Sequence, residues 1–133
     1  MDFRTHVFTY GTLMVPAIWS RVVRGTYATV PGILHGFSRR CLRGRSYPGL
    51  IKGNGSVTGV LYLEVRSDDL LRLDRFEGDE YTRVSGQIEC PRQEPFPAAF
   101  YVVSSRASHL VEDEEWIPEV FTSSGANRFF MQK

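Results

Sequence analysis

Cysteine is scarce in this sequence, and its placement argues against a metal or redox function. The two cysteines, Cys41 and Cys90, show no Cys-x-x-Cys spacing and have no neighbouring histidine, so they resemble neither zinc ligands nor a redox pair. We expect both to be reduced thiols in the core. The three histidines, His6, His35 and His109, are also widely separated. The sequence therefore predicts no metal site.

Long hydrophobic runs and nucleotide-binding motifs are missing as well. No apolar stretch approaches the roughly 18 residues that a membrane-spanning helix needs. The start, MDFRTHVFTY, lacks the basic and then apolar layout of a signal peptide. Neither a Gly-x-Gly-x-x-Gly motif nor a P-loop is present. These absences predict a cytoplasmic protein that needs no cofactor and no membrane.

Charge of one sign is not in excess. Sixteen Lys and Arg residues face fifteen Asp and Glu residues, for a formal net charge of +1, so no overall field draws the chain to nucleic acid or acidic partners. With 133 residues, 42% of them hydrophobic, the chain is long enough for one core and too short to suggest two. We predict a single domain over residues 1–133 and leave the oligomeric state open.

The first half of the chain predicts strands around one short helix. Residues 5–10 form a β-rich run, and the helix opened by Pro16 is expected to end at Gly25. Residues 32–44 carry β-type side chains that two glycines divide into strand-like pieces. The Gly- and Asn-containing stretch over 47–56 predicts a loop.

Residues 56–65 show the clearest strand pattern. Val57, Leu61 and Val65 fall on one side of a strict alternation that is almost wholly apolar. We expect this strand to be central in a sheet.

A helix is predicted directly after that strand. Ser67 is a candidate N-cap followed by acids in the first turn, and Gly78 is a natural stop. One leucine of the apolar stripe is expected to be exposed, because the stripe is wider than a single face. Its members are Leu70, Leu71, Leu73 and Phe76.

The last third predicts two strands, over 82–90 and 98–105, joined by the proline-rich loop 91–97. The tail from 112 to 130 predicts a helix with an acidic start and an aromatic stripe. Strands outnumber helices and do not alternate with them regularly. The sequence thus predicts an α+β fold in which a mixed sheet closes towards a small barrel with flanking helices. The aromatic stripe comprises Trp116, Phe121, Phe129 and Phe130.

The stretch VFTYGTLM is a candidate binding loop. A strand that runs into Gly-Thr exposes backbone N–H groups at its end, and the turn amides can converge on an anion. The alternative is a plain turn between a strand and a helix.

Glu77, in LDRFEGDEYTRV, is a candidate general acid/base. It follows an apolar residue, lies among other acids and falls at a helix C-terminus, where the macrodipole disfavours a carboxylate. Each feature raises a carboxyl pKa towards neutrality. The alternative is a hydrated helix end with no catalytic role.

Taken together, these stretches resemble a known family. VFTYGTLM, YPGLI and LDRFEG followed by EYTRV are similar to the γ-glutamylcyclotransferase superfamily, specifically its γ-glutamylamine cyclotransferase or AIG2-like branch. The resemblance spans residues 6 to about 103, and the tail WIPEVF…RFF is similar to the closing helix of bacterial members.

The resemblance implies a small mixed α/β barrel with a cavity and a reaction that releases 5-oxoproline from a γ-glutamyl amide or amine. It implies that Glu77 is the acid/base and that one loop binds the glutamyl carboxylate. The substrate-binding residues implied in this way are Tyr10, Gly11, Thr12, Leu13 and, on the strand AAFYVV, Tyr101.

The residue inventory fits this chemistry. The α-amine of a γ-glutamyl amide can attack its own γ-carbonyl, so no protein nucleophile is needed. One carboxylate can take the ammonium proton and pass it to the departing amine. The alternative is a non-catalytic or regulatory module that keeps the fold and binds a small carboxylate.

Arginines are concentrated in FSRRCLRGR. As a phosphate-binding strip, Arg39, Arg40, Arg43 and Arg45 would favour nucleic acid, but the neutral net charge and the lack of an RNA-binding signature argue against it. We expect them to rim the cavity or to pair with the acidic stretch EDEE. Arg83 is expected to pair with a carboxylate.

Overall fold

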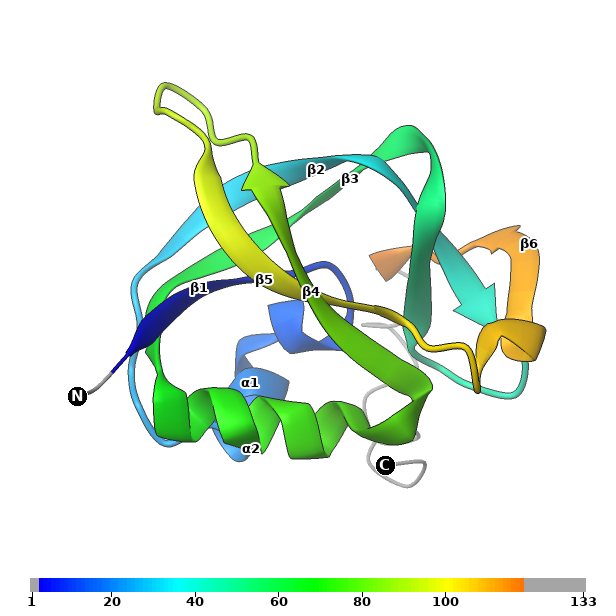
Figure 1. The fold of residues 1–133 in the computed structure, drawn as a ribbon, viewed down its shortest axis with the longest axis horizontal. Coiled ribbons are helices and arrows are strands. Elements are labelled where there is room, and N and C mark those ends of the chain that lie inside the picture. The colour runs from blue at the N-terminus through cyan, green and yellow to red at the C-terminus, as the bar shows by residue number, and fades with distance from the viewer. Residues whose placement is uncertain (1–2, 119–133) are drawn as a thin grey trace.

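The computed structural model describes residues 3–118. Within them the chain forms a curved sheet and two helices (Figure 1). Short 3-10 turns lie at Thr12–Met14, Gly78–Glu80 and Ser108–Leu110. The strands and helices, in chain order, are β1 (Arg4–Thr9), α1 (Pro16–Val22), β2 (Thr29–Leu42), β3 (Pro48–Arg66), α2 (Ser67–Glu77), β4 (Tyr81–Ile88), β5 (Phe96–Val103) and β6 (Val111–Glu115).

The sheet is mixed and curls into a half-barrel. In the described part of the chain its six strands follow the order β4-β5-β1-β3-β2-β6. The β1–β5 pair is parallel, and the other pairs are antiparallel. An isolated bridge between Ile33 and Glu89 links β2 back to the chain just beyond β4. The predicted mixed sheet that closes towards a barrel is confirmed.

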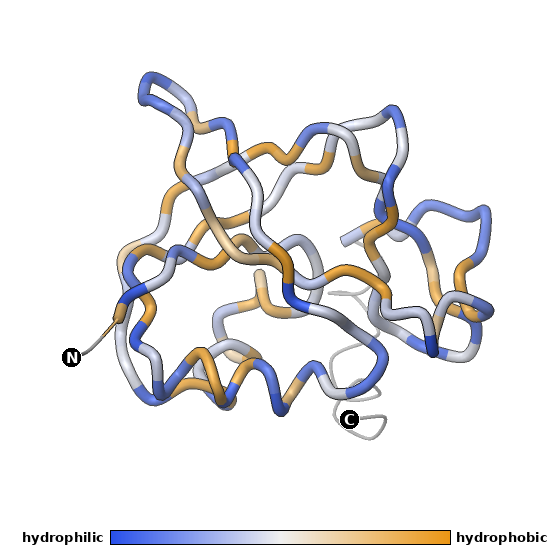
Figure 2. The backbone as a smooth tube through the Cα atoms, in the orientation of Figure 1, coloured by the Kyte–Doolittle hydropathy of each residue, from blue (hydrophilic) through white to orange (hydrophobic). Residues whose placement is uncertain are grey.

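Both faces of the sheet are buried. Val7 and Phe8 are consecutive in β1 and belong to different core clusters, because side chains along a strand point alternately to opposite faces. The helices cover the face of Val7, where Trp19 of α1 stacks on Tyr62 of β3 with ring centroids 3.6 Å apart. In Figure 2 hydrophobic residues recur along the central strands, whereas the tip of the β4–β5 loop is hydrophilic.

The expected loop over 47–56 is wrong. Residues 48–56 open β3, which pairs with β2 from Cys41↔Pro48 to His35↔Ser56. The composition of this stretch is typical of a loop, but pairing with β2 makes it a strand. The first residues of β3 are also buried, which favours the strand. Gly36, at φ 85°, does not divide β2 but lies at a register shift within it.

Two other expectations fail for local reasons. Residues 112–115 lie in β6, an edge strand whose exposed acids suit a sheet edge, and not in a helix. Val65 lies on the opposite face from Leu61, because the register with β1 shifts beside Glu64, at φ 55°. The predicted tail from residue 119 on, including Phe121, Phe129 and Phe130, lies outside the described residues.

The other expectations for β3 and α2 hold, except for the N-cap of α2. The strand over 56–65 is interior to the sheet as part of β3, and α2 ends at Gly78 with φ 69°. Leu71 is the exposed leucine of α2. Ser67 is the first helical residue, and Arg66 takes the N-cap position instead. Within residues 3–118, no helix is long and apolar enough to cross a membrane.

Asp69 anchors the start of α2. Its carboxylate is 1% exposed and accepts hydrogen bonds from the backbone N–H groups of Arg24 and Gly25, both at 2.9 Å, and from the Tyr27 hydroxyl at 2.5 Å. Arg72 adds an ion pair at 2.6 Å. Burial alone would raise the pKa of Asp69, but these hydrogen bonds lower it to about 2. The carboxylate therefore ties the α1–β2 loop to α2.

Replacing Leu61 with Asp should abolish most of the stability. Leu61 is 0% exposed, and an unpaired charge there should lower the free energy of unfolding by about 4 kcal/mol or more. Leu71→Asp, at a position 57% exposed, is the matched control and should melt like wild type. Thermal melts followed by circular dichroism compare the two; equal melting temperatures would refute the placement of Leu61.

Asp69→Asn should destabilise the protein in a pH-dependent way. At pH 7 we expect the free energy of unfolding to fall by roughly 2–4 kcal/mol, because a buried ion pair and its hydrogen bonds are disrupted. The pKa of Asp69 is lowered from 3.8 to about 2, so its stabilisation is present above about pH 4 and is lost as the pH falls through about 2. Urea titrations measure the free energy of unfolding of both proteins. The difference between variant and wild type should be smaller near pH 2 than at pH 7. The exposed neighbour Asp68, which also contacts Arg72, supplies the control Asp68→Asn, with little change expected.

Candidate active site

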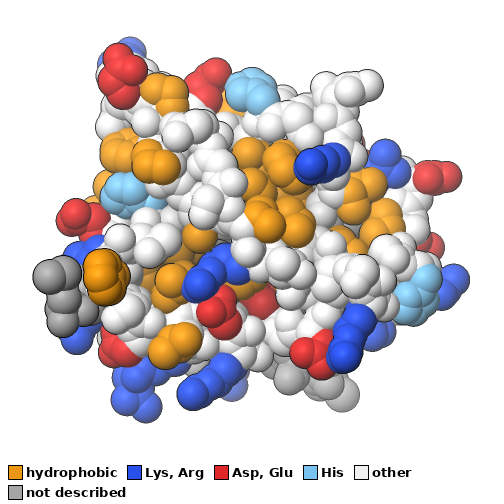
Figure 3. Space-filling view, in the orientation of Figure 1, with side chains coloured by type: hydrophobic (Ala, Val, Ile, Leu, Met, Phe, Trp, Pro, Cys, Tyr) orange, Lys and Arg blue, Asp and Glu red, His pale blue; other side chains and the backbone are white. Residues whose placement is uncertain are grey.

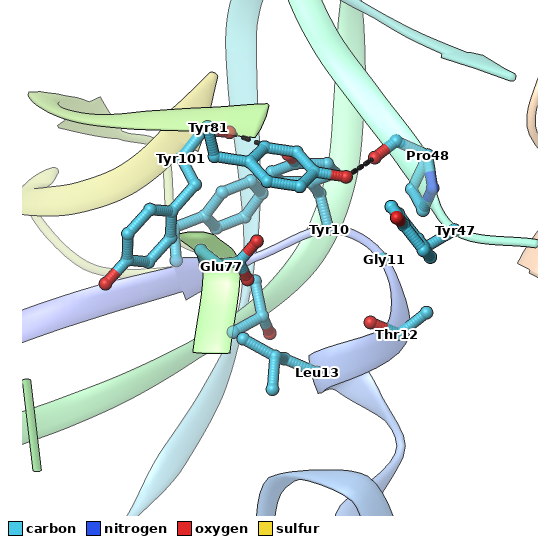
Figure 4. A pocket seen from close by; sticks show the side chains of 11 residues that line it. Tyr10, Gly11, Thr12, Leu13, Tyr47, Pro48, Glu77, Tyr81 and Tyr101 are labelled. Carbon is cyan, nitrogen blue, oxygen red and sulfur yellow. Dashed lines mark hydrogen bonds between the residues drawn. The ribbon is translucent and has the colours of Figure 1, made fainter. Parts of the chain in front are cut away.

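A pocket opens where the end of β1, the β2–β3 turn and the C-terminal end of α2 meet (Figure 4). Its empty volume, counted out to open solvent, is about 360 Å³. All six residues predicted for the site line it: Tyr10, Gly11, Thr12, Leu13, Glu77 and Tyr101. Sequence reasoning missed the other five lining residues, which are Phe8, Thr9, Tyr47, Pro48 and Tyr81.

The loop after β1, from Tyr10 to Leu13, lines the pocket. Its own carbonyls close the 3-10 turn, with Met14 N–H to Gly11 O at 3.0 Å and Val15 N–H to Thr12 O at 3.1 Å. Within residues 3–118 no hydrogen-bond acceptor meets the N–H groups of Gly11, Thr12 or Leu13. Such donors suit an anion.

Arg39 supports this loop from behind. Its Nη1 donates to the carbonyl oxygen of Tyr10 at 2.7 Å and to that of Thr58 at 3.2 Å, and its guanidinium lies 5.7 Å from the centre of the Trp116 ring. Arg40 instead pairs with Asp113 at 3.6 Å. Of the two expectations for the arginine-rich stretch, pairing with the acidic strand is confirmed for Arg40. None of the four arginines is among the described residues that line the pocket, and Arg39 contacts the loop through the Tyr10 carbonyl instead.

Glu77 is the last residue of α2, and its side chain points into the pocket (Figure 4). Gly78 turns the chain away directly after it. Burial raises the pKa values of three phenols, those of Tyr10, Tyr81 and Tyr101. The negative charge of Glu77 raises these pKa values further.

The acid before Glu77 on the same helix has its own partners. The Asp74 carboxylate accepts a hydrogen bond from the Tyr101 hydroxyl at 2.7 Å and pairs with Arg83 at 3.1 Å. Arg83 therefore pairs with a carboxylate, as the sequence predicts.

The acids after Glu77 are also engaged. Glu80 accepts a hydrogen bond from the Tyr47 hydroxyl at 2.6 Å and pairs with Arg45 at 2.9 Å. Asp79 is solvent-exposed and lies 3.3 Å from Arg106. Because each neighbouring acid has an arginine partner, the like-charge argument for Glu77 loses much of its basis.

The two buried phenol hydroxyls of the pocket, those of Tyr10 and Tyr81, both donate hydrogen bonds to backbone carbonyl oxygens. Tyr10 donates to the carbonyl oxygen of Tyr101 at 2.6 Å, and Tyr81 donates to that of Pro48. Their raised pKa values keep both phenols protonated at neutral pH. Among the described lining residues Glu77 is the only carboxylate, and no histidine, lysine or cysteine accompanies it.

Tyr47, Pro48 and Tyr81 each had a signal in the sequence. Tyr47 and Pro48 open the stretch YPGLI, and Tyr81 lies in EYTRV, so the matched motifs already contained them. Their roles were missed because their contacts come from tertiary packing.

Within residues 3–118, no group of three or more His, Cys, Asp or Glu side chains is arranged to hold a metal ion.

Comparison with known proteins assigns the family. A sequence model of the family described as "Gamma-glutamyl cyclotransferase, AIG2-like" matches residues 7–118. The chain belongs to this family. The family match covers most of the chain and includes every residue of the pocket.

Known relatives extend this assignment. Protein AIG2 C from Arabidopsis thaliana is 35% identical over 89 residues, which cover 65% of this chain and 54% of that protein. AIG2-like protein A from the same plant is 38% identical over 81 residues, or 60% of this chain and 49% of that protein. The chain thus spans about half the length of the curated relatives it matches.

Solved structures share the fold. A solution structure from Arabidopsis thaliana has a TM-score of 0.74 at 28% identity and covers 99% of this chain and 79% of the other. A gamma-glutamyl cyclotransferase has a TM-score of 0.67 at 14% identity and covers 78% of this chain and 68% of the other. The second likeness is one of fold alone.

Tyr10→Phe should destabilise the protein through the carbonyl it leaves behind. The Tyr10 hydroxyl is buried and donates to Tyr101 O, so its removal leaves a buried acceptor unsatisfied and should lower the free energy of unfolding by about 1–3 kcal/mol. Tyr101→Phe should lower the free energy of unfolding by less, because the Asp74 carboxylate still has its ion pair with Arg83. Urea denaturation measures both; equal effects would contradict this ranking.

Proposed function

We propose that this protein is a γ-glutamylcyclotransferase-like enzyme that releases 5-oxoproline from a γ-glutamyl amide or amine. The observation that carries the proposal is a single carboxylate, Glu77, in the same pocket as a loop of backbone N–H donors. The family of the chain and the fold of its structural neighbours support it. No cofactor or protein nucleophile enters the scheme.

In this scheme the Tyr10–Leu13 loop binds the α-carboxylate of the glutamyl group. The N–H groups of Gly11, Thr12 and Leu13 are its donors, since they have no acceptor within residues 3–118. The buried phenols donate their protons elsewhere, so their oxygens are left as acceptors for the substrate's α-ammonium group. Tyr10 takes this role beside Glu77, whereas Tyr101 lines the same pocket with its hydroxyl bound to Asp74.

Glu77 moves the proton. It takes one proton from the α-ammonium group, and the free amine attacks the γ-carbonyl to close the five-membered lactam. The C–N bond to the leaving amine breaks as Glu77 returns this proton to the leaving nitrogen. The ring nitrogen, which still carries two hydrogens after the attack, gives up one of them through the same carboxylate to the leaving nitrogen, so the lactam is neutral and the amine departs as an ammonium ion. Atoms balance without a water molecule: one γ-glutamyl amide gives one 5-oxoproline and one amine.

A panel of γ-glutamyl amines and γ-glutamyl dipeptides, assayed for 5-oxoproline, tests the proposal. Turnover of at least one member supports it. Tight binding of small carboxylates without turnover of any member would instead support the alternative, a non-catalytic module of the same fold. A bare anion binder gains nothing from a carboxylate in its site, which is why the presence of Glu77 favours the enzyme.

Glu77→Gln should remove most turnover and leave the fold and the affinity nearly unchanged. The amide keeps the shape of the side chain but cannot relay a proton, and such a loss lowers the rate by roughly 10²–10⁴. The measurement compares kcat, KM and melting temperature. The control is Asp79→Asn, at a side chain that is 86% exposed, which should stay active. An active Glu77→Gln would remove Glu77 from the mechanism.

A further inference from the structure

Glu80 connects two segments that are far apart in the sequence. Its Oε1 accepts the Tyr47 hydroxyl at 2.6 Å, and its Oε2 accepts Nε and Nη2 of Arg45 at 3.1 and 2.9 Å. Both partners lie in the β2–β3 turn, whereas Glu80 lies in the turn between α2 and β4. One carboxylate therefore holds the two sides of the pocket together.

The end of the β2–β3 turn also contacts the Tyr10–Leu13 loop. Pro48 follows Tyr47, and its ring lies so close to Gly11 that a Cβ atom there would be 2.7 Å from Cγ of Pro48. The carbonyl of Pro48 accepts the Tyr81 hydroxyl. The position of Tyr47 and Pro48 thus fixes how far the Gly11 backbone extends into the pocket.

The backbone around Glu80 is held separately. Ser104, just after β5, donates its N–H to Glu80 O at 2.8 Å and its hydroxyl to Asp79 O at 2.6 Å. Loss of the Glu80 carboxylate therefore leaves the turn after Glu77 in place. Its effect should reach the binding loop and not the acid/base.

We propose that Glu80 is a positioning residue that, through Tyr47 and Pro48, sets the place of the Tyr10–Leu13 backbone amides and so the affinity for the glutamyl carboxylate. This inference rests on the proposed function. Glu80 does not touch the substrate; it acts through the wall that Tyr47 and Pro48 form against Gly11. Its role differs from that of Glu77, three residues earlier, although both are glutamates of the same turn.

Kinetics separate the two roles. For Glu80→Gln we expect KM to rise on the order of tenfold with kcat changed by less than about threefold, because the carboxylate contact is equally strong in ground and transition states. Glu77→Gln should show the reverse pattern. Tyr47→Phe should raise KM like Glu80→Gln, and the double variant should fall short of the combined effect, because both changes break one contact.

Amide chemical shifts provide a readout that does not depend on turnover. In ¹⁵N-labelled protein, Glu80→Gln should shift the resonances of Gly11, Thr12 and Leu13, whereas the control Asp79→Asn should not. A lower melting temperature with unchanged KM and unchanged loop resonances would mean a merely structural role and overturn the inference.

Failure of the proposed function is distinguishable from failure of this inference. If wild type turns over no γ-glutamyl compound, the enzyme proposal fails, and the loop resonances still decide whether Glu80 positions the loop. If wild type is active and Glu80→Gln keeps both its KM and its loop resonances, the positioning role alone is wrong.

Discussion

Glu77 reaches the pocket because helix α2 is fixed at both ends. Asp69 ties its first turn to the α1–β2 loop, and Leu73 is fully buried against the sheet in its middle. Beyond its last residue, the backbone of the following turn is bonded to Ser104. A helix held in this way keeps the backbone of its final residue beside the pocket. The position of Glu77, which is the one carboxylate among the described lining residues, depends on these contacts.

The placement of α2 and of the turn after it gives different surroundings to four acids that are close together in the sequence. Asp74 and Glu80 lie three residues before and after Glu77, and each is bound by one tyrosine and one arginine from another element. Asp79 faces solvent. Only Glu77 of the four lines the pocket. Position in the fold, and not residue type, decides which of the four carboxylates lines the pocket.

The sequence was most informative where function depends on contiguous residues. The loop after β1 and the end of α2 each lie within a few positions, so local motifs named the residues that line the pocket there. The failures came from pairing between distant segments: the composition of 47–56 predicts a loop, but residues 48–56 form a strand because β2 pairs with them. The register shift beside Glu64, which places Val65 on the helix-covered face, has no local signal, because its cause is the pairing with β1. For the same reason Tyr47, Pro48 and Tyr81 could not be assigned to the site.

The proposed use of backbone N–H groups to bind an anion is consistent with the position of Glu77. Among the described lining residues no arginine or lysine faces the pocket, and Arg39, the cation behind the binding loop, donates to the Tyr10 carbonyl instead. A cation inside the pocket would form an ion pair with Glu77 and hold its carboxylate as an anion. Backbone N–H groups attract a substrate carboxylate without bringing in a formal charge. The proposed reaction asks one site to bind a carboxylate and to move a proton with another carboxylate, and amides on one side with the acid on the other suit both tasks. The Tyr10–Leu13 loop and Glu77 would supply these two sides of the pocket.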